Sequence, residues 1–196
     1  MSRLRTLIFT TASILLVTSA LAQGPNAQHF AKDGLSFDYA NGWIIVDESN
    51  TDAQQLTLKR EDSDAMIKFF VHRGRVNSPE KMAMAKAKLI DPYLSFTEKQ
   101  FVQMGAKPER TVASTEIGGA PAEGVRIHAV LSGESGEAGV YWNTLGERLV
   151  VLTFFGPDKA RTKAQAAWDT VRNSLKVEPP PLPKGTPQPS PAKTKP

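Results

Sequence analysis

The stretch GLSFDYANGW, residues 34–43, combines a strand pattern with a turn signal. Apolar and polar side chains alternate over residues 35–39 (LSFDY), which is the periodicity of a half-buried β-strand. Asn41-Gly42 favours a tight turn of the kind that joins two antiparallel strands. The mostly apolar residues 43–46 supply a second arm, so the sequence predicts a β-hairpin over residues 34–46.

A second pair of strands is predicted over residues 54–59 and 65–72, with the polar residues 60–64 between them. In the later strand (AMIKFFVH) both alternating faces carry apolar side chains. A strand that is apolar on both faces is typical of the centre of a sheet. We therefore expect this strand to be central and covered on both sides.

Helical spacing begins after Ser78-Pro79, where Ser78 can cap a helix and proline suits the first turn. Asp91-Pro92 interrupts the pattern, because proline lacks an amide hydrogen and disfavours helical backbone in the residue before it. The sequence predicts two helices with a break between them, the second capped by Asp91 and ended by Gly105.

The remainder of the folded part returns to strands. Short turn signals separate four alternating segments, which predicts an antiparallel meander over residues 110–117, 122–131, 137–143 and 148–155. The last segment is apolar on both faces, so we expect cover on both of its sides. Gly156-Pro157-Asp158 then opens an amphipathic helix that should pack on the sheet.

The two ends of the chain differ from its middle. Residues 1–22 contain two arginines, an apolar run and a small-x-small site, which predicts a secretory signal peptide cleaved before Gln23. A membrane anchor is the alternative, but this run is shorter than the roughly 20 apolar residues that span a bilayer. We expect a flexible lead-in over residues 23–33, a single domain over 34–177 and a disordered, proline- and lysine-rich tail over 178–196.

Composition excludes several kinds of chemistry. The chain has no cysteine, so disulfides, thiolate metal sites, a thiol nucleophile and a lipid-modified cysteine are all excluded. The net charge of +4 comes from the two ends, because Arg3 and Arg5 lie in the signal and Lys184, Lys193 and Lys195 lie in the tail. The folded part is close to neutral, and no nucleic-acid partner is predicted. We also expect no membrane-spanning segment after signal cleavage.

The stretch 34–43 resembles the opening of the PsbP-like fold family, in which a G-apolar-S-apolar-x-apolar-P-x-x-W pattern is typical. Ala40 stands where that pattern has proline. The closing strand, short break and helix ending in residues 173–177 (NSLKV) are also similar to the family's last element. The family also includes the Mog-type proteins and the DcrB-like bacterial envelope proteins. The resemblance implies an α+β fold, with a central antiparallel sheet of about six to eight strands and helices on both faces. It implies a binding or assembly factor and no shared active site.

Catalytic and metal-binding signatures are weak. His29, His72 and His128 are far apart in sequence and form no ligand-spaced pair. Residues 133–136 (GESG) contain the serine of a nucleophile elbow, but the segment is one residue short and joins two strands, so we predict a turn. No catalytic residue, metal site or cofactor is predicted.

Two places could contact a partner. His72, Arg73 and Arg75 form the most basic spot of the folded part and could hold an anion or an acidic patch, the alternative being a solvated strand end. In the tail, Pro180, Pro183 and Lys184 match a polyproline ligand motif, the alternative being a spacer without a partner.

Three functions remain open at this point. The leading hypothesis is an exported, periplasmic or secreted, non-enzymatic binding or assembly module of the cell envelope that is not lipid-anchored and has an envelope protein as partner. The second is a carrier of a small ligand, with a pocket between sheet and helices. The third is a hydrolase built from dispersed residues, which requires His72 or His128 to lie near a buried carboxylate or serine.

Overall fold

The computed structural model describes residues 27–181. In chain order the elements are β1 (Ala27–Lys32), β2 (Leu35–Ala40), β3 (Ile44–Asp47), β4 (Ala53–Arg60), β5 (Ser63–His72), α1 (Pro79–Ala85), the π-helical turn η1 (Lys86–Ile90), α2 (Asp91–Gln103), β6 (Glu109–Ile117), β7 (Ala120–Leu131), β8 (Glu134–Leu145), β9 (Arg148–Pro157), α3 (Asp158–Ser174) and β10 (Lys176–Val177).

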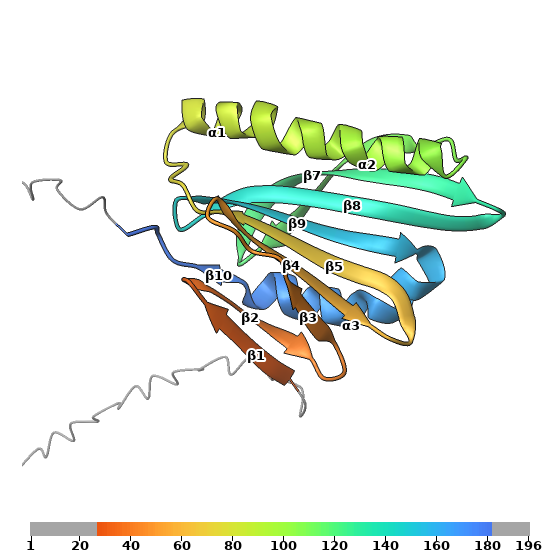
Figure 1. Cartoon of the computed structure of the whole chain (residues 1–196), viewed down its shortest axis with the longest axis horizontal. Coiled ribbons are helices and arrows are strands. Elements are labelled where there is room, and N and C mark those ends of the chain that lie inside the picture. Colours follow the sequence, from red (N-terminus) through yellow and green to blue (C-terminus); the bar gives the residue numbers. More distant parts are fainter. Residues whose placement is uncertain (1–26, 182–196) are drawn as a thin grey trace, which may run out of the picture.

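Seven strands form one antiparallel sheet in the order β3-β4-β5-β9-β8-β7-β6. The α1–α2 segment lies on one face of this sheet, and α3 lies on the other (Figure 1). The predicted fold class is therefore confirmed, and so are the β4–β5 pair and the meander of β6 to β9. The predicted two-sided cover of β9 is also confirmed, because alternate residues of this strand belong to the two opposite cores.

The predicted hairpin over residues 34–46 is wrong, because β2 and β3 lie in different sheets. β2 pairs with β1 and β10 in a separate three-stranded sheet, whereas β3 pairs with β4. Gly42, with φ of 84°, reverses the chain, and Trp43 is buried at the point where the chain passes from one sheet to the other. The Asn41-Gly42 signal predicted the chain reversal correctly, but it did not predict the strands with which β2 and β3 pair.

The predicted flexible lead-in is also wrong from Ala27 onward, since residues 27–32 form β1. Five of its six side chains are exposed, which is why its composition is that of a loop. Main-chain pairing with β2 holds the strand in place, together with Phe30, whose ring stacks on Phe37 at 5.0 Å.

The segment from α1 to α2 is continuous, so the predicted break at Asp91-Pro92 is wrong. Ser78 caps α1 as predicted, and its Oγ accepts a hydrogen bond from the amide of Lys81 at 3.3 Å. In η1 the amide of Asp91 donates to the carbonyl of Lys86, five residues earlier, and Asp91 makes no side-chain cap. This wider turn directly before Pro92 gives the proline ring the room that a regular α-helix lacks. The segment ends at Gly105, as predicted, with φ of 89°.

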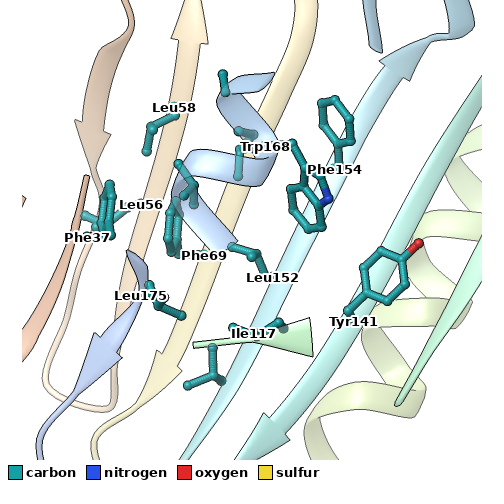
Figure 2. Packing of buried hydrophobic residues seen from close by; sticks show 14 of the residues in the cluster. Phe37, Leu56, Leu58, Phe69, Ile117, Tyr141, Leu152, Phe154, Trp168 and Leu175 are labelled. Carbon is teal, nitrogen blue, oxygen red and sulfur yellow. The ribbon is translucent and has the colours of Figure 1, made fainter. Parts of the chain in front are cut away.

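The larger core lies between the sheet and α3. Trp168 of α3 stacks on Phe154 of β9 at 5.1 Å and contacts Tyr141 of β8 at 5.8 Å (Figure 2). The three-stranded sheet closes the same core beside α3, where Phe37 stacks on Phe69 at 4.4 Å. This face of the sheet is thus covered by a helix and by a second sheet.

Candidate functional site

The α1–α2 segment covers half of its face of the sheet. Its buried residues Ile90, Leu94 and Phe101 pack in a core whose sheet members lie on β7, β8 and β9. On β4 and β5 the side chains of the same face are not buried: Thr57, Met66 and Phe70 are partly exposed and Lys68 is exposed. A hollow results where the helix stops covering the sheet.

This hollow consists of two adjoining parts of about 340 and 430 Å³ that share Lys68, Tyr93 and Thr153. We call it the α2 groove. Strands β4, β5 and β9 form its floor, and η1 and α2 form its wall. The floor includes Thr57, Met66, Lys68, Phe70 and Thr153, and the wall includes Leu89, Tyr93 and Phe96.

The alternation of β5 places the floor residues. Its odd-numbered residues 65–71 are buried against α3, which turns Met66, Lys68 and Phe70 to the groove. Met66 and Phe70 are partly exposed and Lys68 is exposed, so the predicted two-sided cover of β5 is wrong on this face. The lysine between two apolar residues was the signal of incomplete cover that the sequence offered.

Hydroxyl groups close the groove where floor and wall meet. The Tyr93 and Thr153 hydroxyls are hydrogen-bonded at 3.1 Å, and Thr97 Oγ1 donates to the Tyr93 carbonyl at 2.9 Å. Burial raises the pKa of Tyr93 above its ordinary value, although the hydrogen bonds to Thr153 and Thr97 act in the opposite direction. This contact ties α2 to the middle of the sheet.

Lys68 is the cation of the groove. Among residues 27–181 no carboxylate lies within 4 Å of its ammonium group, and Glu48 at one end is the one acidic residue in the lining. In cross-strand register Lys68 stands between Thr57 of β4 and Thr153 of β9. The groove therefore offers one ammonium group among apolar side chains, hydroxyls and the amides of Gln55, Gln100 and Gln103.

The predicted basic spot lies elsewhere, at the end of β5. Arg73 is paired with Asp33 at 2.9 Å, and Arg75 is paired with Glu147. The His72 ring accepts the amide of Gly74 at 3.1 Å. Both guanidinium groups are thus engaged by carboxylates of the same chain, and contact of this spot with an anion or a partner stays a prediction.

The first residues of the predicted tail are attached to this spot. The Glu178 amide donates to the Gly34 carbonyl at 2.7 Å, and Arg75 Nη2 donates to the Pro180 carbonyl at 2.7 Å. Residues 178 and 180, which the tail prediction included, are therefore held against the folded part. Pro183 and Lys184 lie outside the described residues.

Arg148 is a buried charge that the sequence did not point to. It is 3% exposed, and its guanidinium donates to the carbonyls of His72 and Asp33 and to Gln54 Oε1. Burial lowers the pKa of Arg148. Since Nε, Nη1 and Nη2 each donate to one of these neutral acceptors, we assign Arg148 to joining β9 with β4 and with the turn between β1 and β2.

The structure brings His128, Ser135 and Asp158 together. Ser135 Oγ lies 2.7 Å from His128 Nε2 and donates to Asp158 Oδ2 at 2.6 Å. In a hydrolytic triad the histidine stands between serine and carboxylate. Here the serine stands in the middle: its proton is donated to Asp158, its oxygen accepts from His128 Nε2, and the carboxylate does not orient the ring. Ser135 and Asp158 are only partly buried, so they are not the buried partners that the hydrolase hypothesis requires, and the order of groups does not support a Ser-His-Asp mechanism.

Residues 27–181 contain neither a cluster suited to a metal ion nor a helix suited to crossing a membrane. No cluster of three or more histidine, cysteine, aspartate or glutamate side chains is placed to hold a metal ion. Within the same residues, no helix combines the length and the apolar character that a membrane crossing needs.

Comparison with solved structures gives a match over most of the chain. The solution structure of cyanobacterial PsbP (CyanoP) from Synechocystis sp. PCC 6803 is similar to it at a TM-score of 0.50 and 15% identity, over 83% of this chain and 98% of that one. The chain has the PsbP-like fold.

A second match is weaker. A crystal structure from Bacteroides thetaiotaomicron VPI-5482 has a TM-score of 0.48 and 12% identity, over 78% of this chain and 49% of that one. No protein-family model matches the chain. No curated protein matches it either.

Proposed function

We propose that this chain is an exported, non-enzymatic binding protein of the cell envelope and that it holds its ligand in the α2 groove. The observation that carries the proposal is the uncovered half of one sheet face, where an unpaired lysine stands among apolar side chains. Export rests on the predicted signal peptide, and the absence of cysteine argues against a lipid anchor.

The lining of the groove favours a small ligand over a protein partner. Clefts that bind small molecules are lined mainly by apolar side chains with a few polar groups that fix orientation. The α2 groove fits this description, with Phe70, Leu89 and Phe96 around Lys68 and the hydroxyl pair Tyr93–Thr153. The carrier hypothesis is thus the form of the proposal that the geometry supports best.

A site-specific photocrosslinker tests this proposal in cells. Phe96 is 57% exposed and lines the groove, whereas Val102, on the same helix, is 58% exposed and does not. With p-benzoylphenylalanine at position 96 we expect one defined adduct, identified by mass spectrometry, and at position 102 none. An unmodified protein at position 96, or the same adducts at both positions, contradicts the proposal.

An assembly factor that holds an envelope protein is a second candidate, favoured by the edge strand β6. This strand ends the seven-stranded sheet, and Val112 in its middle is 93% exposed. Open edges can accept a strand from a partner. The crosslinker at position 112 should capture a protein if this candidate is correct, and the absence of a protein adduct there contradicts it.

A further inference from the structure

The α2 groove has a charge pattern that selects one kind of ligand. Lys68 stands at the centre, shared by both parts of the groove, and apolar Met66 and Phe70 lie two residues away on either side of it along β5. At about 3.3 Å per residue, each lies roughly 7 Å from the lysine. A ligand that extends from Lys68 into one part of the groove therefore needs an anionic end and an apolar body.

Main-chain pairing argues against an extended peptide as the ligand. β4 is paired on both sides by β3 and β5, and β5 is paired on both sides by β4 and β9. The wall is a helix whose amides bond within the helix. The floor and wall thus have no free row of amides and carbonyls, and the polar backbone of a bound peptide would lose its water without replacement.

The chain's own tail is also a poor occupant. Its last residues carry Lys184, Lys193 and Lys195 and no acidic side chain. These lysines would bring positive charge to Lys68, and like charges repel. A hydrocarbon chain that ends in a carboxylate has neither problem, because its single polar end can pair with the ammonium group.

We propose that the α2 groove binds a long-chain carboxylate, with the carboxylate on Lys68 and the hydrocarbon in the part of the groove lined by Met66 and Phe96. This inference rests on the proposed function and names its ligand class. Thr57, beside Lys68 in the sheet, is placed to donate a second hydrogen bond to the carboxylate. Apolar contact supplies affinity, and the ion pair fixes the direction in which the chain lies.

Calorimetry with dodecanoate, below the concentration at which it forms micelles, tests the charge. The mature chain should bind dodecanoate, and Lys68→Gln should weaken binding about five-fold, as expected for an exposed ion pair. Lys99→Gln on α2 is the matched control, because it makes the same change in net charge at an exposed position outside the groove. Dodecyltrimethylammonium should bind more weakly than dodecanoate. Equal affinity of the two surfactants, or equal affinity of the two lysine variants, overturns the proposal.

The apolar wall is tested in the same way. Phe96→Ala should weaken dodecanoate binding by about ten-fold, whereas Val102→Ala should leave it unchanged. Far-ultraviolet circular dichroism shows whether each variant is folded. If dodecanoate does not bind while the crosslinker at position 96 yields an adduct of other chemistry, the ligand assignment fails and the proposed function stands. If dodecanoate does not bind and the crosslinker at position 96 yields no adduct, the ligand assignment and the proposed function are both contradicted.

Discussion

The two faces of the seven-stranded sheet differ in how completely they are covered. On the α3 face, the helix and the three-stranded sheet lie side by side, and Phe37, Phe69 and Phe154 between them are at most 3% exposed. On the α2 face a single helical segment covers β7, β8 and β9, and Lys68 of β5 is exposed.

The difference follows from the widths of the elements. Strands about 4.8 Å apart make a seven-stranded sheet about 29 Å wide, whereas a helix with its side chains is about 10–12 Å wide. One helix cannot cover a face of this sheet. The α3 face gains a second cover from β1, β2 and β10, while no described element plays that part on the α2 face. A binding surface can thus arise where a fold lacks a second covering element.

The largest expected effect comes from opening the covered face. Trp168→Ala removes a ring that is 5% exposed and stacked on Phe154, which should lower the free energy of unfolding by about 3–5 kcal/mol. Phe96→Ala removes a ring of the open face that is 57% exposed, and its effect should stay within about 0.5 kcal/mol. Urea unfolding of both variants measures the contrast. Similar losses for the two would show that the groove side is packed as tightly as the α3 side.

The next effect concerns the strand that holds the second cover. Gly146 has φ of 53°, and a Cβ there would lie 2.1 Å from the carbonyl oxygen of Val177 in β10. Gly146→Ala should therefore displace β10 and cost about 3 kcal/mol, of which about 1 kcal/mol is backbone strain. Gly133 has φ of 85° and open space around it, so Gly133→Ala should cost the strain alone. Urea unfolding gives both costs, and hydrogen exchange in β1 and β2 should rise for Gly146→Ala alone. Equal costs would show that β10 does not depend on this close approach.

Local patterns predicted elements well and partners poorly. The meander followed from alternation and short turns, because short turns force neighbouring antiparallel strands. The strand over residues 35–40 was also predicted, but one of its partners, β10, lies more than 130 residues later in the chain. The other partner, β1, has few apolar side chains. Such pairings depend on packing in the assembled core. A short stretch of sequence holds no information on that packing.

Part of the α2 groove could be predicted from the sequence. A lysine between Met66 and Phe70 indicates a strand whose second face is not fully covered, and this signal was outweighed by the apolar residues beside it. The wall was harder to predict, because Pro92 indicated a break where η1 keeps the helix continuous. Without a continuous helix, Leu89 and Phe96 could not be assigned to one wall.

A smaller effect is expected at the boundary between covered and open halves of the α2 face. Thr153→Val removes the hydroxyl that bonds to Tyr93, which should cost about 1 kcal/mol. The pKa of Tyr93, already raised by burial, should rise further, because the hydrogen bond from Thr153 lowers it. Because the pKa of Tyr93 is raised on folding, its neutral hydroxyl contributes to the stability of the fold below the unfolded pKa of about 10. This contribution of Tyr93 is lost as pH rises above that value. Carbon-13 spectra of labelled tyrosine follow the titration, and an unchanged Tyr93 curve in Thr153→Val contradicts the assignment. Thr111→Val, exposed on β6, is the control.

The smallest effect is expected at the rim of the covered face, where Lys32 of β1 pairs with Asp47 of β3 at 2.7 Å. Hydrogen bonds from Lys32 and from Ser49 hold the pKa of Asp47 well below its usual range. A carboxyl whose pKa is lowered on folding stabilises the fold above its unfolded pKa of about 3.9, and the contribution is lost as pH falls through the folded pKa. Asp47→Asn should therefore lower the urea midpoint slightly at pH 7, by less than Thr153→Val does, and the difference from the unmodified chain should shrink as pH falls below about 5. Asp52→Asn, exposed in the loop before β4, makes the same change in charge and is the control. A difference that persists at low pH would mean that the pair between the two sheets acts through packing and not through the charge of Asp47.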